Sequence, residues 1–244
     1  SKKITMGIET KKFEKKFSKK VTNNYSMMVN SGSSANLLIF QCLINPKIKK
    51  LKKGDEVLIP AICWSTSLWP IIQSGLKVKF VDIDLENLNI DIKDFKRKIS
   101  KKSKALMLVH ALGNCADMNK ITTICKKKRL ILVEDTCEAL GSKFKGKNLG
   151  TFGDFSSFSF FYSHHITSGE GGMICVKSKK YADVIKTLRS HGWSREISKK
   201  KKNNWTFINS GFNLRPTDIS AAIGSSQLNK LNKILNIRKR NFRL

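Results

Sequence analysis

The sequence predicts an α/β fold with a mostly parallel β-sheet covered by helices on both faces. Short β-branched runs alternate with longer segments of helical periodicity along the chain. The short runs are apolar almost throughout, which is typical of strands buried on both faces. Alternation of such strands with helices is the pattern of a sheet layered between helices. Sheets of this kind bind ligands beyond the carboxyl ends of their strands.

The elements follow one another in a regular order. Apolar runs predict the strands Glu56–Pro60, Val78–Asp82, Ala105–His110, Leu130–Glu134, Phe155–Phe161 and Met173–Val176. Helical spacing predicts the helices Ser34–Leu43, Thr66–Gln73, Ile92–Ile99, Asn119–Lys128 and Ala182–Ser190. The lysine-rich stretch Lys199–Asn204 indicates an exposed loop, and Gly211–Pro216 a second irregular connection. From Thr217 onward the apolar spacing is helical again.

Length and hydropathy bound the class of protein. With 244 residues the chain is long enough for one large domain with a substantial core. It begins without an initiator methionine and ends within a basic, helix-like stretch from Leu228 to Leu244, so we expect a fragment. No apolar run approaches the roughly 20 residues of a membrane span, and no signal peptide is evident. We expect a cytoplasmic protein that does not interact with membranes.

The net charge is strongly positive, +29 from 47 Lys plus Arg against 18 Asp plus Glu. Alone, such an excess would suggest a polyanionic partner such as nucleic acid. The lysines, however, are spread over the whole chain and far outnumber the arginines, which are the usual residues for base reading and bidentate phosphate binding. We therefore interpret the charge as a solvated lysine-rich surface and expect no specific nucleic-acid partner.

The cysteines do not indicate a metal or iron–sulfur site. They are scattered, with no CxxC or CxC pair and no clustering with histidine: Cys42, Cys63, Cys115, Cys125, Cys137 and Cys175. Zinc and iron–sulfur sites usually need closer spacing. We expect reduced, mostly buried thiols in a cytosolic protein without a bound metal.

Two segments suggest groups for binding an anion and a heterocycle. Ser31–Asn36 follows an apolar run and opens a helix, where small residues let backbone amides approach a phosphate. An ordinary helix start is the alternative. Asp135 lies at the carboxyl end of a predicted strand, directly after Glu134 and shortly before Glu138. A carboxylate there could hold a heterocyclic N–H in its protonated state. Metal binding or helix capping would explain the same acid.

Trp64, His164 and His165 are further candidates. Trp64 comes just after a strand, where an indole can cover a flat ring by stacking. A partly buried core tryptophan is the commoner fate of such a residue. His164 and His165 follow a Phe-rich strand. With an unperturbed pKa of about 6.5, one of them could move protons near neutrality. A hydrogen-bonded structural pair is the alternative.

Together these segments resemble the DegT/DnrJ/EryC1/StrS family of sugar aminotransferases, which use pyridoxal phosphate (PLP). Within the family the sequence is most similar to the branch of 3-dehydratases acting on GDP-4-keto-6-deoxy-mannose. The resemblance covers essentially the whole chain, in order. It is carried by Thr5–Gly7, Ser31–Asn36, Gly54–Pro60, Val78–Asp84, Asn87–Asp91, Glu134–Asp135, Gly150–Gly153, Ser159–Gly172, Arg189–Trp193 and Gly211–Pro216.

The resemblance implies the PLP-dependent transferase fold of the aspartate aminotransferase type, fold type I. Residues 1–227 would form the large cofactor-binding domain, shortened at its N-terminus. Residues 228–244 would begin a helix leading to a smaller C-terminal domain that the chain lacks. A homodimer with a shared active site is implied as well, because Asn213 matches a residue that reaches the phosphate of the neighbouring subunit's cofactor.

The resemblance also implies roles for single residues. Gly32, Ser33 and Ser159 match residues that hold the cofactor phosphate. Other positions match residues around the cofactor ring: Asp135 for the ring nitrogen, Trp64 for stacking and Glu138 for the neighbourhood of the ring hydroxyl.

His164 stands where the family's aminotransferases carry the lysine that binds the cofactor covalently. The resemblance therefore implies that PLP, or pyridoxamine phosphate (PMP), binds noncovalently and that His164 acts as the general base. His165 is the weaker candidate for that role. His191 is a candidate on the substrate side.

The implied reaction removes the C3 hydroxyl of a nucleotide-linked 4-keto-6-deoxyhexose, with L-glutamate restoring the amino form of the cofactor. Three alternatives stay open. A nucleotide-sugar 4-aminotransferase would need a lysine within 159–172, which has none. An iron–sulfur-linked CDP-4-keto-6-deoxyglucose 3-dehydrase would need clustered cysteines after the histidine segment, and none follows Cys175. A catalytically inactive relative acting as a binding protein is the third.

Overall fold

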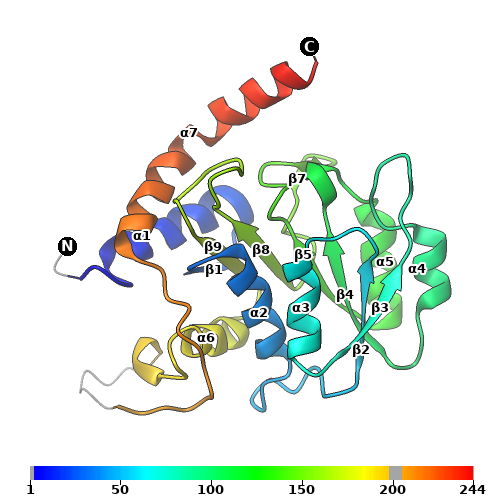
Figure 1. Ribbon diagram of the computed structural model, residues 1–244, viewed down its shortest axis with the longest axis horizontal. Coiled ribbons are helices and arrows are strands. Elements are labelled where there is room, and N and C mark those ends of the chain that lie inside the picture. Colours follow the sequence, from blue (N-terminus) through cyan, green and yellow to red (C-terminus); the bar gives the residue numbers. More distant parts are fainter. Residues whose placement is uncertain (1–2, 198–204, 244) are drawn as a thin grey trace.

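The computed structural model describes residues 3–197 and 205–243 and shows a β-sheet between two layers of helices (Figure 1). Within these residues, seven strands form the sheet in the order β1-β9-β8-β5-β4-β2-β3. They are β1 (Tyr25–Val29), β2 (Glu56–Pro60), β3 (Lys77–Val81), β4 (Ser103–Val109), β5 (Ile131–Asp135), β8 (Phe155–Ser159) and β9 (Gly172–Val176). A small separate hairpin pairs β6 (Lys143–Phe144) with β7 (Lys147–Asn148).

The sheet is mostly parallel, as the sequence predicts. Strands β3, β2, β4, β5 and β8 are parallel neighbours. Strand β9 is antiparallel to both β8 and β1. In that register Gly172 pairs with Val29 on one side and with Ser159 on the other. The chain segments that follow β1 and β8 therefore start next to each other.

Successive side chains of a strand point to opposite faces of the sheet, so the core is divided into two layers. Met27 and Ile174 pack with residues of α2 (Gly32–Leu43), α3 (Ser65–Gln73) and α6 (Lys179–Leu188). Their neighbours Met28 and Met173 face the other way and pack with residues of α1 (Ile8–Phe17) and α7 (Asp218–Phe242). On that second face, α4 (Ile92–Lys98) and α5 (Met118–Lys128) cover the strands farther along the sheet. Short helical turns occur at Ser18–Thr22, Ala111–Gly113 and Ser194–Glu196.

The predicted strands and helices all form, with ends that differ by at most three residues. The β6–β7 hairpin, the short helical turns and two longer elements, α1 and β1, escaped prediction. Helix α1 is rich in lysine, so its buried residues Phe13 and Phe17 give a weak apolar pattern. Strand β1 has few β-branched residues, although its last three residues are buried. The predicted connection Gly211–Pro216 is irregular, and the predicted loop Lys199–Asn204 lies outside the described residues.

Helix α7 extends away from the rest of the molecule at its C-terminal end (Figure 1). It runs without interruption across residue 227, where we place the end of the large domain, and that division stays a prediction. In the part of the chain that the structure describes, no helix combines the length and the apolar content needed to cross a membrane.

Asp218, the first residue of α7, ties this helix to the start of α1. Its Oδ1 accepts hydrogen bonds from the Gly7 amide and the Thr10 hydroxyl, each at 2.7 Å. Its Oδ2 accepts one from the Glu9 amide at 3.2 Å. The N-cap residue of α1, Gly7, has no side chain to cap the helix, so Asp218 performs that function from another helix.

We expect Asp218→Ala to lower the free energy of unfolding by about 2 kcal/mol at pH 7, as for other lost caps and charged hydrogen bonds. Burial raises the pKa of Asp218, but its bonds from Thr10, Gly7 and Glu9 outweigh burial and leave that pKa below its ordinary value. The stabilisation is therefore present at neutral pH and lost as the pH falls through the folded-state pKa.

Urea unfolding at pH 7 and in acid measures both effects. Asp183→Ala, a substitution inside α6, is the matched control. An equal loss in the control, or a loss at Asp218 that persists undiminished in acid, would contradict the assignment.

Candidate functional site

Most of the predicted site residues lie at the carboxyl ends of the parallel strands. Helix α2 begins just after β1, α3 just after β2, and the segment 160–171 connects β8 to β9 (Figure 1). Close approach at this edge depends on Gly172, because a Cβ there would overlap the carbonyl oxygen of Ser31. The start of α2 and the end of β8 therefore lie directly against each other.

A cradle suited to an anion forms where α2 meets β8. A Cβ at Gly32 would lie 2.6 Å from the Cβ of Ser159 and 3.1 Å from the Sγ of Cys137, so only glycine permits this approach. Ser31 is the N-cap of α2 and its side chain accepts a hydrogen bond from the Ser34 amide at 3.0 Å. The helix N-terminus favours a phosphate or carboxylate at this point. Both interpretations of Ser31–Asn36, helix start and anion site, fit the structure.

Two serines complete the cradle. Ser33 is exposed, and its hydroxyl donates to the hydroxyl of Thr66 on α3 at 2.9 Å. Ser159 is buried, and its hydroxyl accepts a hydrogen bond from the Phe161 amide at 3.3 Å. The structure thus brings Gly32, Ser33 and Ser159 to one edge of the sheet, as their predicted role in phosphate binding requires.

Asp135 lies at the end of β5 on the side of α2 and α3. Its Oδ2 accepts hydrogen bonds from the Ser67 hydroxyl at 2.7 Å and from Nδ2 of Asn36 at 2.9 Å. Its Oδ1 accepts one from the Cys137 amide at 3.1 Å. The residue ends a strand and no helix begins there, so the helix-capping interpretation is wrong. Its carboxylate is fixed in orientation and suited to bind a heterocyclic N–H.

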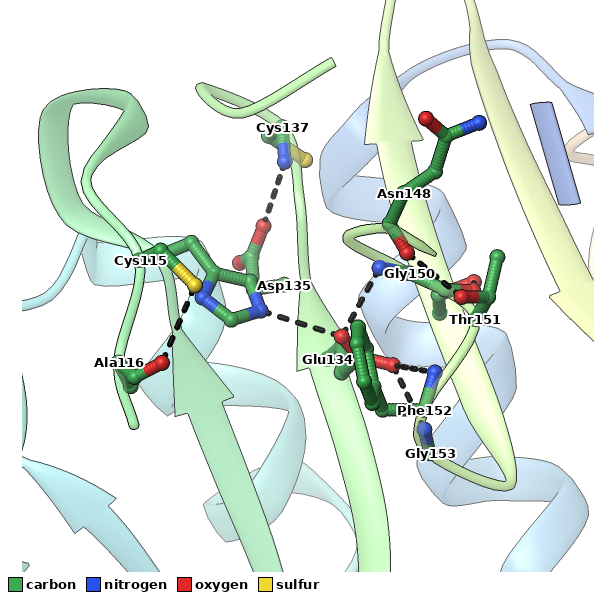
Figure 2. A network of polar contacts seen from close by, with 12 residues as sticks. Cys115, Ala116, Glu134, Asp135, Cys137, Asn148, Gly150, Thr151, Phe152 and Gly153 are labelled. Carbon is green, nitrogen blue, oxygen red and sulfur yellow. Dashed lines mark hydrogen bonds and ion pairs between the residues drawn. The ribbon is translucent and has the colours of Figure 1, made fainter. Parts of the chain in front are cut away.

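Glu134 points to the opposite face of the sheet and forms a separate buried network (Figure 2). Its Oε1 accepts hydrogen bonds from the amides of Phe152 at 2.8 Å and Gly153 at 2.6 Å. Its Oε2 accepts one from the Gly150 amide at 2.8 Å and lies 3.2 Å from Nε2 of His110. Burial raises the pKa of Glu134, but His110 and the backbone donors outweigh it, so the pKa lies below its ordinary value. This carboxylate fixes the turn that leads into β8.

His164 is half-buried in the segment after β8. Burial has the largest effect on its pKa and lowers it, the charges of Glu138 and Asp135 raise it, and Arg238 lowers it again. The resulting pKa lies below the ordinary value, so the imidazole is neutral at pH 7 and able to accept a proton. Arg238 reaches from α7 and donates to the carbonyl oxygens of Ser163 and His164, each at 3.3 Å.

His165 differs from its neighbour. Burial, together with the charges of Arg238 and His164, lowers its pKa to about 4. Its buried Nδ1 finds no hydrogen-bond partner anywhere in residues 3–197 and 205–243. A hydrogen-bonded structural pair of histidines is therefore not what the structure contains.

Trp64 and Glu138 belong to the same edge of the sheet. Trp64 immediately precedes α3 and is 73% exposed, so the core-tryptophan interpretation is wrong and its ring is open to a ligand. Glu138 follows β5, and its Oε2 accepts a hydrogen bond from the Leu112 amide at 2.9 Å. Among the residues that the structure describes, no cluster of His, Cys, Asp and Glu has the arrangement of a metal site.

Asn213 and His191 occupy a second region. Asn213 is exposed, its Oδ1 accepts a hydrogen bond from Nε of Arg215 at 3.0 Å, and its backbone pairs with Ser190. The amide of the exposed His191 donates to the carbonyl oxygen of Phe212 at 2.7 Å. The described contacts do not join either side chain to Asp135 or His164, and their predicted roles stay predictions.

A cavity of about 730 Å³ lies in this second region. Its lining includes six basic residues: Lys3, Lys11, Lys186, Arg189, Arg195 and Arg215. One wall contains the buried Arg189, whose guanidinium pairs with Glu14 at 2.8 Å and Glu196 at 2.7 Å. The ring of Trp193, also in the lining, stacks on Trp205 with centroids 4.7 Å apart. A basic cavity beside stacked indoles has the chemistry to hold an anionic, aromatic ligand such as a nucleotide.

The sequence did not single out four residues that the structure places in or beside the site. Asn36 was noticed only as part of a small-residue segment, and Ser67 not at all. His110 and Arg238 have no motif around them. Of these four residues, only His110 has a local signal in the sequence, because it is an ionisable residue at the end of a predicted buried strand.

Comparisons with known proteins identify the family and the fold. The model of the DegT/DnrJ/EryC1/StrS aminotransferase family matches residues 1–244. GDP-4-keto-6-deoxy-D-mannose 3-dehydratase of Escherichia coli O55:H7 is 42% identical over 99% of this chain. The chain spans 65% of that relative's length, slightly less than two thirds.

Solved structures give the same result. An E. coli GDP-4-keto-6-deoxy-D-mannose-3-dehydratase with bound hydrated PLP superposes with a TM-score of 0.95 at 41% identity, covering 99% of this chain and 65% of that one. A mutant GDP-4-keto-6-deoxymannose-3-dehydratase with bound GDP-perosamine has a TM-score of 0.95 at 40% identity, covering 99% of this chain and 66% of that one. The fold is the one expected from the sequence, and the chain belongs to the DegT/DnrJ/EryC1/StrS aminotransferase family.

Proposed function

We propose that this protein is a nucleotide-sugar 3-dehydratase that binds PLP and PMP noncovalently and uses His164 as its general base. One observation carries the proposal. A half-buried imidazole with a lowered pKa lies within the electrostatic reach of Asp135 and Glu138, in a segment, 159–172, that contains no lysine. The similarity to GDP-4-keto-6-deoxy-D-mannose 3-dehydratases over nearly the whole chain supports the same proposal.

The residues present fit the cofactor. The cradle of Gly32, Ser33 and Ser159 suits its phosphate, because Gly32 lets the N-terminus of α2 lie directly against Ser159 and a helix N-terminus favours an anion. The fixed carboxylate of Asp135 suits its ring nitrogen. Two further side chains are placed for its ring, the exposed indole of Trp64 and the anchored carboxylate of Glu138. When bound, the cofactor supplies an electron sink for a carbanion.

Two side chains would then hold or move protons. The carboxylate of Asp135 would keep the ring nitrogen of the bound cofactor protonated. His164, neutral at pH 7, would accept the proton at C4′ and deliver it to the departing C3 hydroxyl oxygen of the sugar. An imidazole can perform both steps because it exchanges protons near neutral pH, and it forms no stable bond to an aldehyde.

We place the nucleotide part of the substrate in the basic cavity, with His191 near the sugar and L-glutamate as the amino donor. The lysines and arginines of the lining and the stacked indoles support this placement. A related dehydratase has been solved with bound GDP-perosamine, which supports a GDP-linked sugar. Asn213 would reach the cofactor of a second subunit in a homodimer. Six cysteines with free thiols agree with the reducing cytoplasm as the site of action.

The alternative functions have less support. A sugar 4-aminotransferase would need a lysine near Asp135 to bind the cofactor, and 159–172 has none. A CDP-sugar 3-dehydrase of the iron–sulfur type would need clustered cysteines.

The direct test of the proposed function supplies the natural full-length protein with PMP, L-glutamate and GDP-4-keto-6-deoxy-mannose and follows loss of the C3 oxygen by mass spectrometry. No loss of that oxygen would reject the proposal.

We expect His164→Asn to slow dehydration at least about 100-fold, the lower end of what a positioned general base contributes. Asparagine retains a polar side chain but cannot accept the proton. The dissociation constant of PMP should change little, since the phosphate cradle and Asp135 remain. Single-turnover kinetics and equilibrium dialysis measure the two quantities. His165→Asn is the control and should retain activity; an active His164→Asn enzyme would show that another group is the base.

In the pH profile of kcat/KM, the acidic limb should report the pKa of His164, because activity is lost as the pH falls below that pKa. Arg238 lowers this pKa and Glu138 raises it. Arg238→Gln should therefore move the limb to higher pH, and Glu138→Gln should move it to lower pH. If the acidic limb moved in the same direction in both variants, or moved in neither, His164 would be ruled out as the titrating group.

A further inference from the structure

The proposed function assigns Asp135 to the ring nitrogen of the cofactor but does not explain why two helices donate to its carboxylate. We propose that Asn36 and Ser67 are positioning residues that hold Asp135 as an oriented anion against that nitrogen. The proposal rests on the proposed function and concerns how the same site works.

The contacts fix the carboxylate from three elements. Asn36 on α2 and Ser67 on α3 donate to Oδ2, at 2.9 and 2.7 Å, and the amide of Cys137 donates to Oδ1 at 3.1 Å. Donors on both oxygens define the plane of the carboxylate. Hydrogen bonds to an ionised acceptor are also stronger than those between neutral groups.

Burial makes these donors necessary. Asp135 is 5% exposed, Asn36 2% and Ser67 1%. Water therefore has little access to replace a lost donor. A buried carboxylate without donors tends to take up a proton, and a neutral carboxyl group no longer favours a protonated ring nitrogen. Asn36 and Ser67 thus act on the cofactor through the charge of Asp135.

The orientation of the Asn36 amide supports a donor role. Its Nδ2 donates to Asp135 and to the carbonyl oxygen of Thr66 at 3.2 Å. Its buried Oδ1 finds no hydrogen-bond partner among the described residues. The reverse orientation would set Oδ1 against the carboxylate, where two acceptors repel. Both N–H groups are used, and an acceptor is left unpaired to keep them in place.

The same two helices offer a comparison. Gln41 on α2 donates to the hydroxyl of Ser74, the residue just after α3, at 3.0 Å. This bond also joins an amide side chain to a serine, and it does not involve Asp135. The helices are thus joined elsewhere, so the contacts of Asn36 and Ser67 with Asp135 are not needed merely to hold α2 beside α3.

The test uses the natural full-length protein with two probes, PMP and PLP labelled with ¹⁵N in the ring. The single variants are Asn36→Leu and Ser67→Ala, and the matched controls are Gln41→Leu and Ser74→Ala. Equilibrium dialysis gives the dissociation constant of PMP. The ¹⁵N chemical shift of bound PLP, followed against pH, reports protonation of the ring nitrogen, which a purely structural effect would leave unchanged.

We expect each variant at the site to raise the dissociation constant of PMP about tenfold, the effect of losing one hydrogen bond to a charged group. The ring nitrogen should lose its proton at a lower pH than in the wild type. Both controls should match the wild type in both measurements.

Three outcomes would overturn the inference in distinguishable ways. A ¹⁵N titration unchanged in both variants would show that Asn36 and Ser67 do not act through Asp135. Equal changes in the controls would show a general effect of the contact between α2 and α3. If the wild-type protein itself bound no PLP, the proposed function would fall, and this inference with it.

Discussion

Side-chain alternation at the end of β5 is the constraint on which the site depends. Because successive residues of a strand face opposite ways, Glu134 and Asp135 enter different layers of the molecule. Glu134 binds the turn that leads into β8, and Asp135 faces α2 and α3. One dipeptide therefore fixes both the strand that carries Ser159 and the carboxylate proposed to bind the cofactor. A shift of one residue in the register of β5 would exchange the two and destroy both arrangements.

The rest of the site is assembled by sheet order. Strand β9 lies between β1 and β8, so the start of α2 meets the end of β8 although 127 residues separate Gly32 from Ser159. Helix α7 closes the arrangement from the other face of the sheet, since Asp218 caps α1 and Arg238 holds the backbone at His164. The imidazole proposed as the general base is thus positioned by the loop after β8 and by a helix far along the chain.

Much of this could be predicted from the sequence, and the limits have physical causes. The buried parallel strands are visible as apolar runs, and the sequence alone indicates that Asp135 and His164 follow or end such runs and that Ser31–Asn36 opens a helix, because these are local properties. The partners of Asp135 were not predictable. Asn36 and Ser67 lie 99 and 68 residues away from it, and only tertiary packing brings them together. The exposure of Trp64 is likewise decided by packing.

The most direct measurement asks whether PLP is bound covalently. The natural full-length protein is saturated with PLP, treated with borohydride and digested, and its peptides are examined for a pyridoxyl group by mass spectrometry. His164 in the place of a lysine predicts that PLP leaves the wild-type protein unattached, while a His164→Lys variant carries the group at residue 164. A lysine of the wild-type protein that is labelled in proportion to the bound cofactor would contradict noncovalent binding.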